Sequence, residues 1–160
     1  MIRPVEKGDA KVICKIYNHY IENSVITFEE EPIPVEEMQN RIREITVSLP
    51  WFVYQVGEKI IGYAYANRWK LKSAYRYAVE TTIYLSPGET GRGIGSRLYG
   101  ELIASLKTHH MHCAIGVITI PNPASIALHE RMGFEKVAHF REVGWKFNQW
   151  IDVGYWELML

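Results

Sequence analysis

The sequence has no net charge, no long apolar run and almost no cysteine. Eighteen basic and eighteen acidic side chains cancel, so the long-range attraction that draws a protein to nucleic acid or anionic lipid is missing. No apolar run approaches the roughly 18 residues that cross a bilayer, and charged residues close to the N-terminus are unlike a secretory signal. We therefore expect a soluble, cytoplasmic protein with no nucleic-acid or membrane partner, in which local groups hold any anionic ligand.

The two cysteines, Cys14 and Cys113, are too few for a disulfide framework and lack CxxC spacing. This usage is typical of a reducing compartment, and both thiols are expected to be buried packing residues. Internal repeats, low-complexity tracts and linker-like segments are also missing. The 160 residues therefore predict one domain that spans residues 1–160.

Hydrophobic periodicity alternates along the chain between the period of helices and that of strands. Asp9 is the expected N-cap of the first helix, and tight turns are expected at Gly57-Glu58 and at Asn148-Gln149. This order of elements predicts an α/β (α+β) fold in which helices cover both faces of a mixed sheet. The predicted helices are 7–23, 32–45, 94–107 and 122–132, and the predicted strands are 1–5, two within 51–69, 75–86, 112–120, 134–147 and 149–160.

A glycine-rich loop, residues 85–98, separates a predicted strand from a predicted helix. In its sequence, LSPGETGRGIGSRL, the glycines Gly91, Gly93 and Gly95 alternate, so that backbone N–H groups and the positive end of the helix can face one phosphate. Ile94 stands where a Walker-type loop needs lysine, and GxGxG differs from the GxGxxG dinucleotide fingerprint, so ATP, GTP and NAD are disfavoured. From the residues alone, a simple tight turn remains an alternative.

This loop and a later motif together resemble the GNAT superfamily of acetyl-CoA-dependent N-acetyltransferases. Gly93 and Gly95 match the glycine positions of the family's pyrophosphate loop, and Thr90 stands where that loop usually has Gln or Arg. Residues 122–134, NPASIALHERMGF, match the pattern of the family's later helix. The segments IYNHYIENSVITFEEEP, YAYANRWKLKSAYRYAVETTIYL and GWKFNQWIDVGYWEL resemble the phosphinothricin and methionine sulfoximine acetyltransferase branch, so the likeness covers essentially the whole chain.

The resemblance implies a single-domain GNAT fold with a mixed, mostly antiparallel sheet, acetyl-CoA as co-substrate, no metal and a homodimer. The implied reaction is direct acetyl transfer to the α-amine of a small amino-acid-like substrate such as phosphinothricin, methionine sulfoximine or methionine sulfone. Another amine acceptor (a polyamine, an aminoglycoside or a protein N-terminus) and a non-catalytic acetyl-CoA-binding module remain alternatives. Histidines in 109–112 lie at a helix end without further ligands, so they are not expected to hold a metal.

An aromatic-rich segment near the C-terminus is larger than one small core needs. Its side chains either line the dimer interface that the resemblance implies or cap the sheet. These residues are Trp145, Phe147, Trp150, Tyr155 and Trp156.

The resemblance also assigns the cofactor contacts. The main chain of Ile83, Tyr84 and Leu85 would pair with the pantetheine arm as an added strand does, and Asn122 and Ser125 would lie beside that arm. Asn122 is also a predicted helix N-cap, a role that leaves part of its hydrogen-bonding capacity free. The pyrophosphate would be held by Thr90, Gly91, Arg92, Gly93, Ile94, Gly95 and Ser96.

Glu80 is the candidate general base. It lies in an apolar, β-forming run, YAVETTIYL, where glutamate is uncommon, and burial there would raise the pKa of its carboxyl into a usable range. From the residues alone, a solvent-facing edge position or a partner for an arginine is equally open. The resemblance assigns Glu80 the proton of the attacking amine and makes His129 the acid for the departing thiolate or a relay with Glu80.

The substrate is expected to bind between the first two helices and beyond the first hairpin. There, cations would hold a carboxylate and a phosphinate or sulfoximine group, and Glu29 would hold the ammonium group. A solvated cluster of charges is the alternative for any one of them. The candidates are Phe28, Glu29, Arg68, Lys70, Lys72, Arg76, Thr81 and Thr82.

Overall fold

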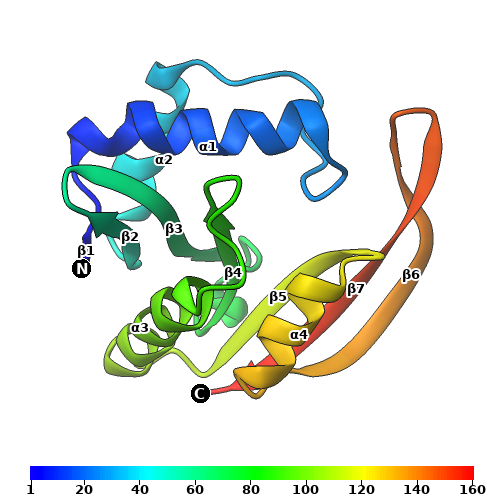
Figure 1. Cartoon of the computed structure of the whole chain (residues 1–160). Helices are drawn as coiled ribbons and strands as arrows, with labels where there is room; N and C mark the ends of the chain where they lie inside the picture. Colours follow the sequence, from blue (N-terminus) through cyan, green and yellow to red (C-terminus); the bar gives the residue numbers. More distant parts are fainter.

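The computed structural model describes residues 1–160 as one mixed sheet with helices on both faces (Figure 1). The seven strands lie in the order β1-β2-β3-β4-β5-β7-β6, and only β4 and β5 run parallel. The prediction of a mixed, mostly antiparallel sheet is confirmed. The strands are β1 Ile2–Pro4, β2 Trp51–Val56, β3 Lys59–Arg68, β4 Ala78–Leu85, β5 Cys113–Ile120, β6 Glu135–Lys146 and β7 Gln149–Met159. The helices are α1 Ala10–Asn23, α2 Val35–Ile45, α3 Ile94–Thr108 and α4 Pro123–Arg131, with short 3-10 turns η1 Lys7–Asp9 and η2 Ser73–Tyr75.

The start of α1 differs from the prediction. Asp9 precedes the helix, but its side chain caps no helical N–H group. Instead, its carboxylate accepts hydrogen bonds from the backbone N–H of Glu6 at 2.8 Å and from the guanidinium of Arg3 at 2.7 and 2.9 Å. The Asp9 carboxylate therefore serves a capping box of η1 and an ion pair with Arg3, instead of a cap of α1.

The two tight turns are both present, one of them displaced. Val56 pairs with Lys59 across Gly57-Glu58, as predicted. The second turn is 147–148, one residue earlier than predicted, because the strand pairing reaches Gln149. Both of its residues have positive φ angles, 50° and 56°, as a two-residue turn of type I′ requires.

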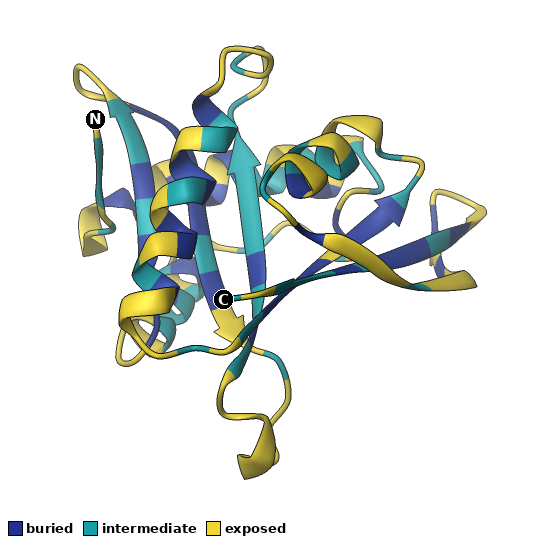
Figure 2. Cartoon of the chain, turned by 90° about the horizontal axis from the view of Figure 1, so that it is seen from below, coloured by how far each residue is buried: buried dark blue, intermediate teal, exposed yellow.

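Two hydrophobic cores lie on opposite faces of the sheet. α1 and α2 cover one face, where Ile13, Met38 and Trp51 are buried, and α3 packs on the other through Leu98 and Leu102. Figure 2 shows buried residues along the central strands, between helices whose outer surfaces are exposed.

The two cysteines have different surroundings. Cys14 is buried in the core under α1 and α2, as expected. Cys113 is only half-buried, and its Sγ lies 3.5 Å from a carboxylate oxygen of Glu157. The expectation of burial is therefore wrong for Cys113, which begins β5 at the edge of the core.

The sheet opens between its two parallel strands. β4 pairs with β5 only over 78–81, opposite 113–116. Beyond that point β4 stays with β3 as far as Leu85, whereas β5 stays with β7 as far as Ile120. On the side of β5, the second half of β4 therefore presents main-chain groups that no neighbouring strand uses, and the candidate site lies in this opening.

Candidate active site

Two adjoining cavities occupy the opening between β4 and β5. One, the inner cavity, has a volume of about 400 Å³, and the other, the loop cavity, has about 420 Å³. Five residues line both cavities, which makes them one continuous site: Ile26, Ile83, Tyr84, Asn122 and Ser125.

The glycine loop forms the end wall of the loop cavity, at the start of α3. Gly91 and Gly93 have φ angles of 77° and 74°, a left-handed conformation that glycine adopts without strain. No side chain caps α3, so the N–H groups of its first turn have no intrahelical partner and remain available. The loop thus offers backbone donors and the positive helix end to an anion. The predicted residues that line this cavity are Thr90, Gly91, Gly93, Gly95 and Ser96.

Two of the predicted pyrophosphate-binding residues, Arg92 and Ile94, do not line the loop cavity. The guanidinium of Arg92 is exposed and pairs with Glu89 at 2.7 Å. The side chain of Ile94 is buried in the protein interior, so that only its main chain can serve a ligand.

β4 and α4 form the long walls of the loop cavity. Ile83, Tyr84 and Leu85 line it, where β5 has diverged from β4, and the carbonyl oxygen of Leu85 accepts a hydrogen bond from the Tyr20 hydroxyl at 2.6 Å. The Oδ1 atom of Asn122 accepts a hydrogen bond from the backbone N–H of Ser125 at 3.2 Å, which confirms the predicted N-cap. The amide nitrogen of Asn122 donates no hydrogen bond within the chain, so it can serve a ligand as well.

Glu80 lines the inner cavity without an ionic or hydrogen-bonding partner of its own. Burial raises the pKa of its carboxyl, and the positive charge of Lys70 offsets that rise only in part. Glu80 lies on a central strand, between Asn67 of β3 and Ile115 of β5. The two alternatives left open by the sequence, an edge position and a pairing with arginine, therefore do not apply.

His129 is held by hydrogen bonds at both ring nitrogens. Its Nδ1 lies 2.8 Å from the carbonyl oxygen of Ser125, and its Nε2 lies 3.0 Å from the hydroxyl of Tyr99. A carbonyl oxygen only accepts, so Nδ1 carries the proton, and in the neutral ring the bare Nε2 accepts the proton of Tyr99. The Tyr99 oxygen in turn lies 2.5 Å from Oγ1 of Thr81. Burial lowers the pKa of His129, which favours this neutral form.

Sequence reasoning missed Tyr99. Its place in the apolar repeat of α3, next to Leu98, reads as a core position, and it is indeed fully buried. Nothing in the local pattern indicates that its hydroxyl reaches across the core to the ring of His129.

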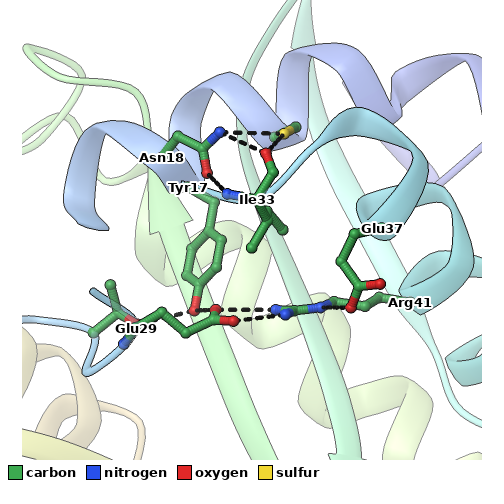
Figure 3. Close-up of polar contacts among 8 residues, drawn as sticks. Tyr17, Asn18, Glu29, Ile33, Glu37 and Arg41 are labelled. Atoms are coloured by element: carbon green, nitrogen blue, oxygen red, sulfur yellow. Dashed lines mark hydrogen bonds and ion pairs between the residues drawn. The ribbon is translucent and has the colours of Figure 1, made fainter. Parts of the chain in front are cut away.

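The predicted substrate residues divide into two groups. Phe28, Thr81 and Thr82 line the inner cavity, whereas Glu29 does not. The carboxylate of Glu29 accepts two hydrogen bonds from Arg41, at 2.6 and 3.0 Å, and another from the hydroxyl of Tyr17 (Figure 3). This pairing lowers the pKa of Glu29 and leaves it engaged in the protein.

None of the four predicted cations lines either cavity. All four are exposed, at the end of β3 and in the segment before β4. Lys70 lies 4.8 Å above the ring of Trp69, and Arg76 lies 4.6 Å from that of Tyr77. The other two are Arg68 and Lys72.

No three side chains of His, Cys, Asp or Glu lie together in a way that could hold a metal ion. The histidines at 109–112 follow α3, and His109 bonds back to Ser105 of that helix. None of the helices combines the length and apolar character that a bilayer span needs.

Comparison with known proteins identifies the family. A model of the acetyltransferase (GNAT) domain matches residues 2–154. The chain belongs to the GNAT acetyltransferases. It is 39% identical over 160 residues to a phosphinothricin N-acetyltransferase of Streptomyces coelicolor, covering 98% of this chain and 94% of the relative. It is also 30% identical to an L-methionine sulfoximine/L-methionine sulfone acetyltransferase of Salmonella typhimurium, covering 99% and 94%.

Solved structures agree with this GNAT assignment. A phosphinothricin acetyltransferase from Sinorhizobium meliloti in complex with acetyl-CoA matches with a TM-score of 0.97 at 36% identity, covering 100% of this chain and 88% of that chain. The protein is thus an acetyl-CoA-dependent N-acetyltransferase of the phosphinothricin and methionine sulfoximine branch. The predictions of family, fold, enzyme class and co-substrate are confirmed.

Proposed function

We propose that this N-acetyltransferase acetylates the α-amine of a small amino-acid-like acceptor, of the phosphinothricin, methionine sulfoximine or methionine sulfone type. The observation that carries the proposal is the unpaired carboxylate of Glu80 in a cavity of about 400 Å³. Such a cavity suits an amino acid better than a polyamine or an aminoglycoside, which would need several carboxylates. The names of the Streptomyces and Salmonella relatives support the same acceptor class.

The loop cavity fits acetyl-CoA. We propose that the amides of 91–96 and the start of α3 hold the pyrophosphate, and that the main chain of 83–85, on the side away from β3, pairs with the pantetheine arm. The amide nitrogen of Asn122 and the hydroxyl of Ser125 lie where both cavities meet, beside the position proposed for the thioester. When bound there, acetyl-CoA supplies the activated acetyl group.

Glu80 is the proposed general base. An α-ammonium group must lose a proton before its nitrogen can attack, and an unpaired carboxylate with a raised pKa is matched to that task. We propose His129 as part of the chain formed with Tyr99 and Thr81, rather than as an acid that donates directly. In its neutral form both of its ring nitrogens are already engaged.

We propose four exposed cations, at the end of β3 and before β4, as ligands of the acidic groups of the acceptor. The cations Arg68, Lys70, Lys72 and Arg76 lie on one exposed segment, and Lys70 is near enough to Glu80 to influence its pKa. We do not propose Glu29 as the ligand of the ammonium group, because Arg41 already occupies its carboxylate.

A homodimer is also proposed. The hairpin of β6 and β7 exposes large apolar side chains that a second copy would cover. These residues are Val137, Phe140, Val143, Trp145, Phe147 and Trp150.

Release of free thiol from acetyl-CoA tests the acceptor class. The panel contains phosphinothricin, methionine sulfoximine, methionine sulfone, spermidine, kanamycin and a peptide with a free N-terminus. We expect turnover with at least one of the first three and a far lower kcat/KM with the others. Turnover confined to spermidine, kanamycin or the peptide would overturn the assignment. Tight binding of acetyl-CoA without turnover of any amine would favour a binding module instead.

A further inference from the structure

One wall of the inner cavity is a loop rather than a helix or strand. Residues 24–31, the first part of the segment between α1 and α2 and here called the wall loop, contribute Ile26, Thr27 and Phe28 to the cavity. A loop holds a cavity wall in place only if its own position is secured by contacts with the rigid elements around it.

The helical side of the wall loop is fastened by the contacts in Figure 3. Glu29 is bound to Arg41 of α2 and Tyr17 of α1. The Tyr17 hydroxyl also lies 2.9 Å from Oγ1 of Thr27. These contacts hold the end of the loop that leads into α2.

The opposite side is fastened by Lys146, near the tip of the β6–β7 hairpin. This side chain is only 2% exposed, although lysine is almost never buried without a partner. Its Nζ donates one hydrogen bond, at 2.8 Å, to the carbonyl oxygen of Thr27, and no carboxylate lies within ion-pair distance. Burying an ammonium group is unfavourable. The burial of Lys146 against the wall loop therefore indicates that this contact serves to position the loop.

Gly144, two residues before Lys146, packs against Phe28, the wall-loop residue that follows Thr27. Gly144 and Lys146 face the protein while Trp145 between them is exposed, as strand alternation dictates. A Cβ atom added at Gly144 would overlap the ring of Phe28. The ring of Phe28 therefore packs directly against the backbone of Gly144, in the space that a side chain would fill. We call this contact the seat of the ring.

We propose that Gly144 and Lys146 are positioning residues that set the wall of the acceptor cavity through Phe28 and Thr27, and so determine which acceptors bind. The inference rests on the proposed function, since it takes the inner cavity as the acceptor site. The residues that they contact, Thr27 and Phe28, line the inner cavity and not the loop cavity, so we expect the effect on the acceptor rather than on acetyl-CoA.

A double-mutant cycle between Gly144→Ala and Phe28→Ala tests the seat. In the wild-type background, the added methyl group displaces the ring, and we expect the KM for the best acceptor to rise about tenfold. In the Phe28→Ala background the methyl group meets no ring, so Gly144→Ala should change that KM less than about twofold. The Kd of acetyl-CoA should stay constant throughout. Gly8→Ala, where a Cβ meets nothing within 4 Å, is the matched control.

Lys146→Met tests the contact between Lys146 and the carbonyl oxygen of Thr27. Lys59→Met, at an exposed position, is its control. We expect faster amide hydrogen exchange in 24–31, unchanged exchange in α3, and a higher acceptor KM at constant acetyl-CoA Kd. Equal effects of Gly144→Ala in both backgrounds, or an acceptor KM that neither Gly144→Ala nor Lys146→Met alters, would overturn the inference. A wild-type enzyme without activity on any amino-acid acceptor would instead overturn the proposed function.

Discussion

At the scale of single residues, the candidate site is distinguished by a carboxylate that has no ionic or hydrogen-bonding partner. Two carboxylates near it are engaged, Glu29 by Arg41 and Glu89 by Arg92. Glu80 has no such partner and lies beside a cavity, in surroundings that disfavour its charge. A partly buried carboxylate without a partner costs stability, so we propose that Glu80 is kept on a central strand for its chemistry.

The substitution Glu80→Gln tests this role. We expect turnover to fall by roughly 10²- to 10⁴-fold while the Kd of acetyl-CoA is unchanged. The wild-type kcat/KM should fall as the pH drops through the raised pKa of Glu80, because only the carboxylate can accept a proton. A rate that does not vary between about pH 5 and about pH 9 would remove Glu80 from the base role.

The same substitution has a predictable effect on stability. With its pKa raised in the folded state, Glu80 binds a proton more readily there than in the unfolded chain. Its unfavourable contribution therefore appears as the pH rises above the unfolded-state value. At neutral pH, Glu80→Gln should show an equal or higher melting temperature in a thermal-unfolding measurement. A clear loss of melting temperature would indicate a structural role instead.

At the scale of elements, the junction of β4 with α3 performs two tasks. β4 loses its parallel neighbour after Thr81, which frees main-chain groups, and the glycine loop then turns the chain into α3 with uncapped N–H groups. The free strand edge and the free helix start face the same cavity. A ligand with both a phosphate and an extended amide-containing arm fits this pair of features.

The substitution Gly93→Val tests the loop, and Gly88→Val is its matched control. Both glycines have positive φ angles, 74° and 84°, and a Cβ atom added at either would meet only open space, so both variants bear similar backbone strain. Only Gly93 lines the loop cavity. We expect the Kd of acetyl-CoA, measured by calorimetry, to rise at least about tenfold for Gly93→Val because the side chain crowds the amides. An equal change in the two variants would contradict the phosphate assignment.

At the scale of the whole molecule, the β6–β7 hairpin has two different faces. Its inner face holds the wall loop through Lys146 and Gly144, whereas its outer face exposes Trp145 and Trp150 at 48% and 60%. Exposed aromatic side chains that cluster on one strand pair are typical of an interface. The hairpin would therefore connect the proposed subunit association with the shape of the proposed acceptor cavity.

The homodimer is tested by light scattering after size exclusion. We expect a mass about twice the 18.6 kDa of one chain. Trp150→Lys should shift the protein toward the monomer with an unchanged far-UV spectrum. Val47→Lys, at a position 82% exposed that follows α2 and lies outside the hairpin, should leave the mass unaltered. A monomeric wild-type protein would refute this interface.

Much of the protein could be predicted from its sequence because the relevant signals are local. Periodicity identifies the helices and strands, and Asn122 with Pro123 marks the start of α4. The glycine spacing marks the loop before α3, and a glutamate within an apolar strand marks the candidate base. Each of these depends on residues within one or two turns of one another, where spacing determines direction.

Only the tertiary structure decided how these parts meet. Thr27 and Lys146 are 119 residues apart in the chain, and His129 and Tyr99 are separated by 30. Arg41 takes the carboxylate of Glu29 that the sequence had assigned to a substrate. Such partnerships depend on how elements pack across a sheet, and no local pattern specifies which distant side chain will satisfy a buried polar atom. The sequence by itself determined the elements and the family, whereas packing decided which functional groups remain free to act.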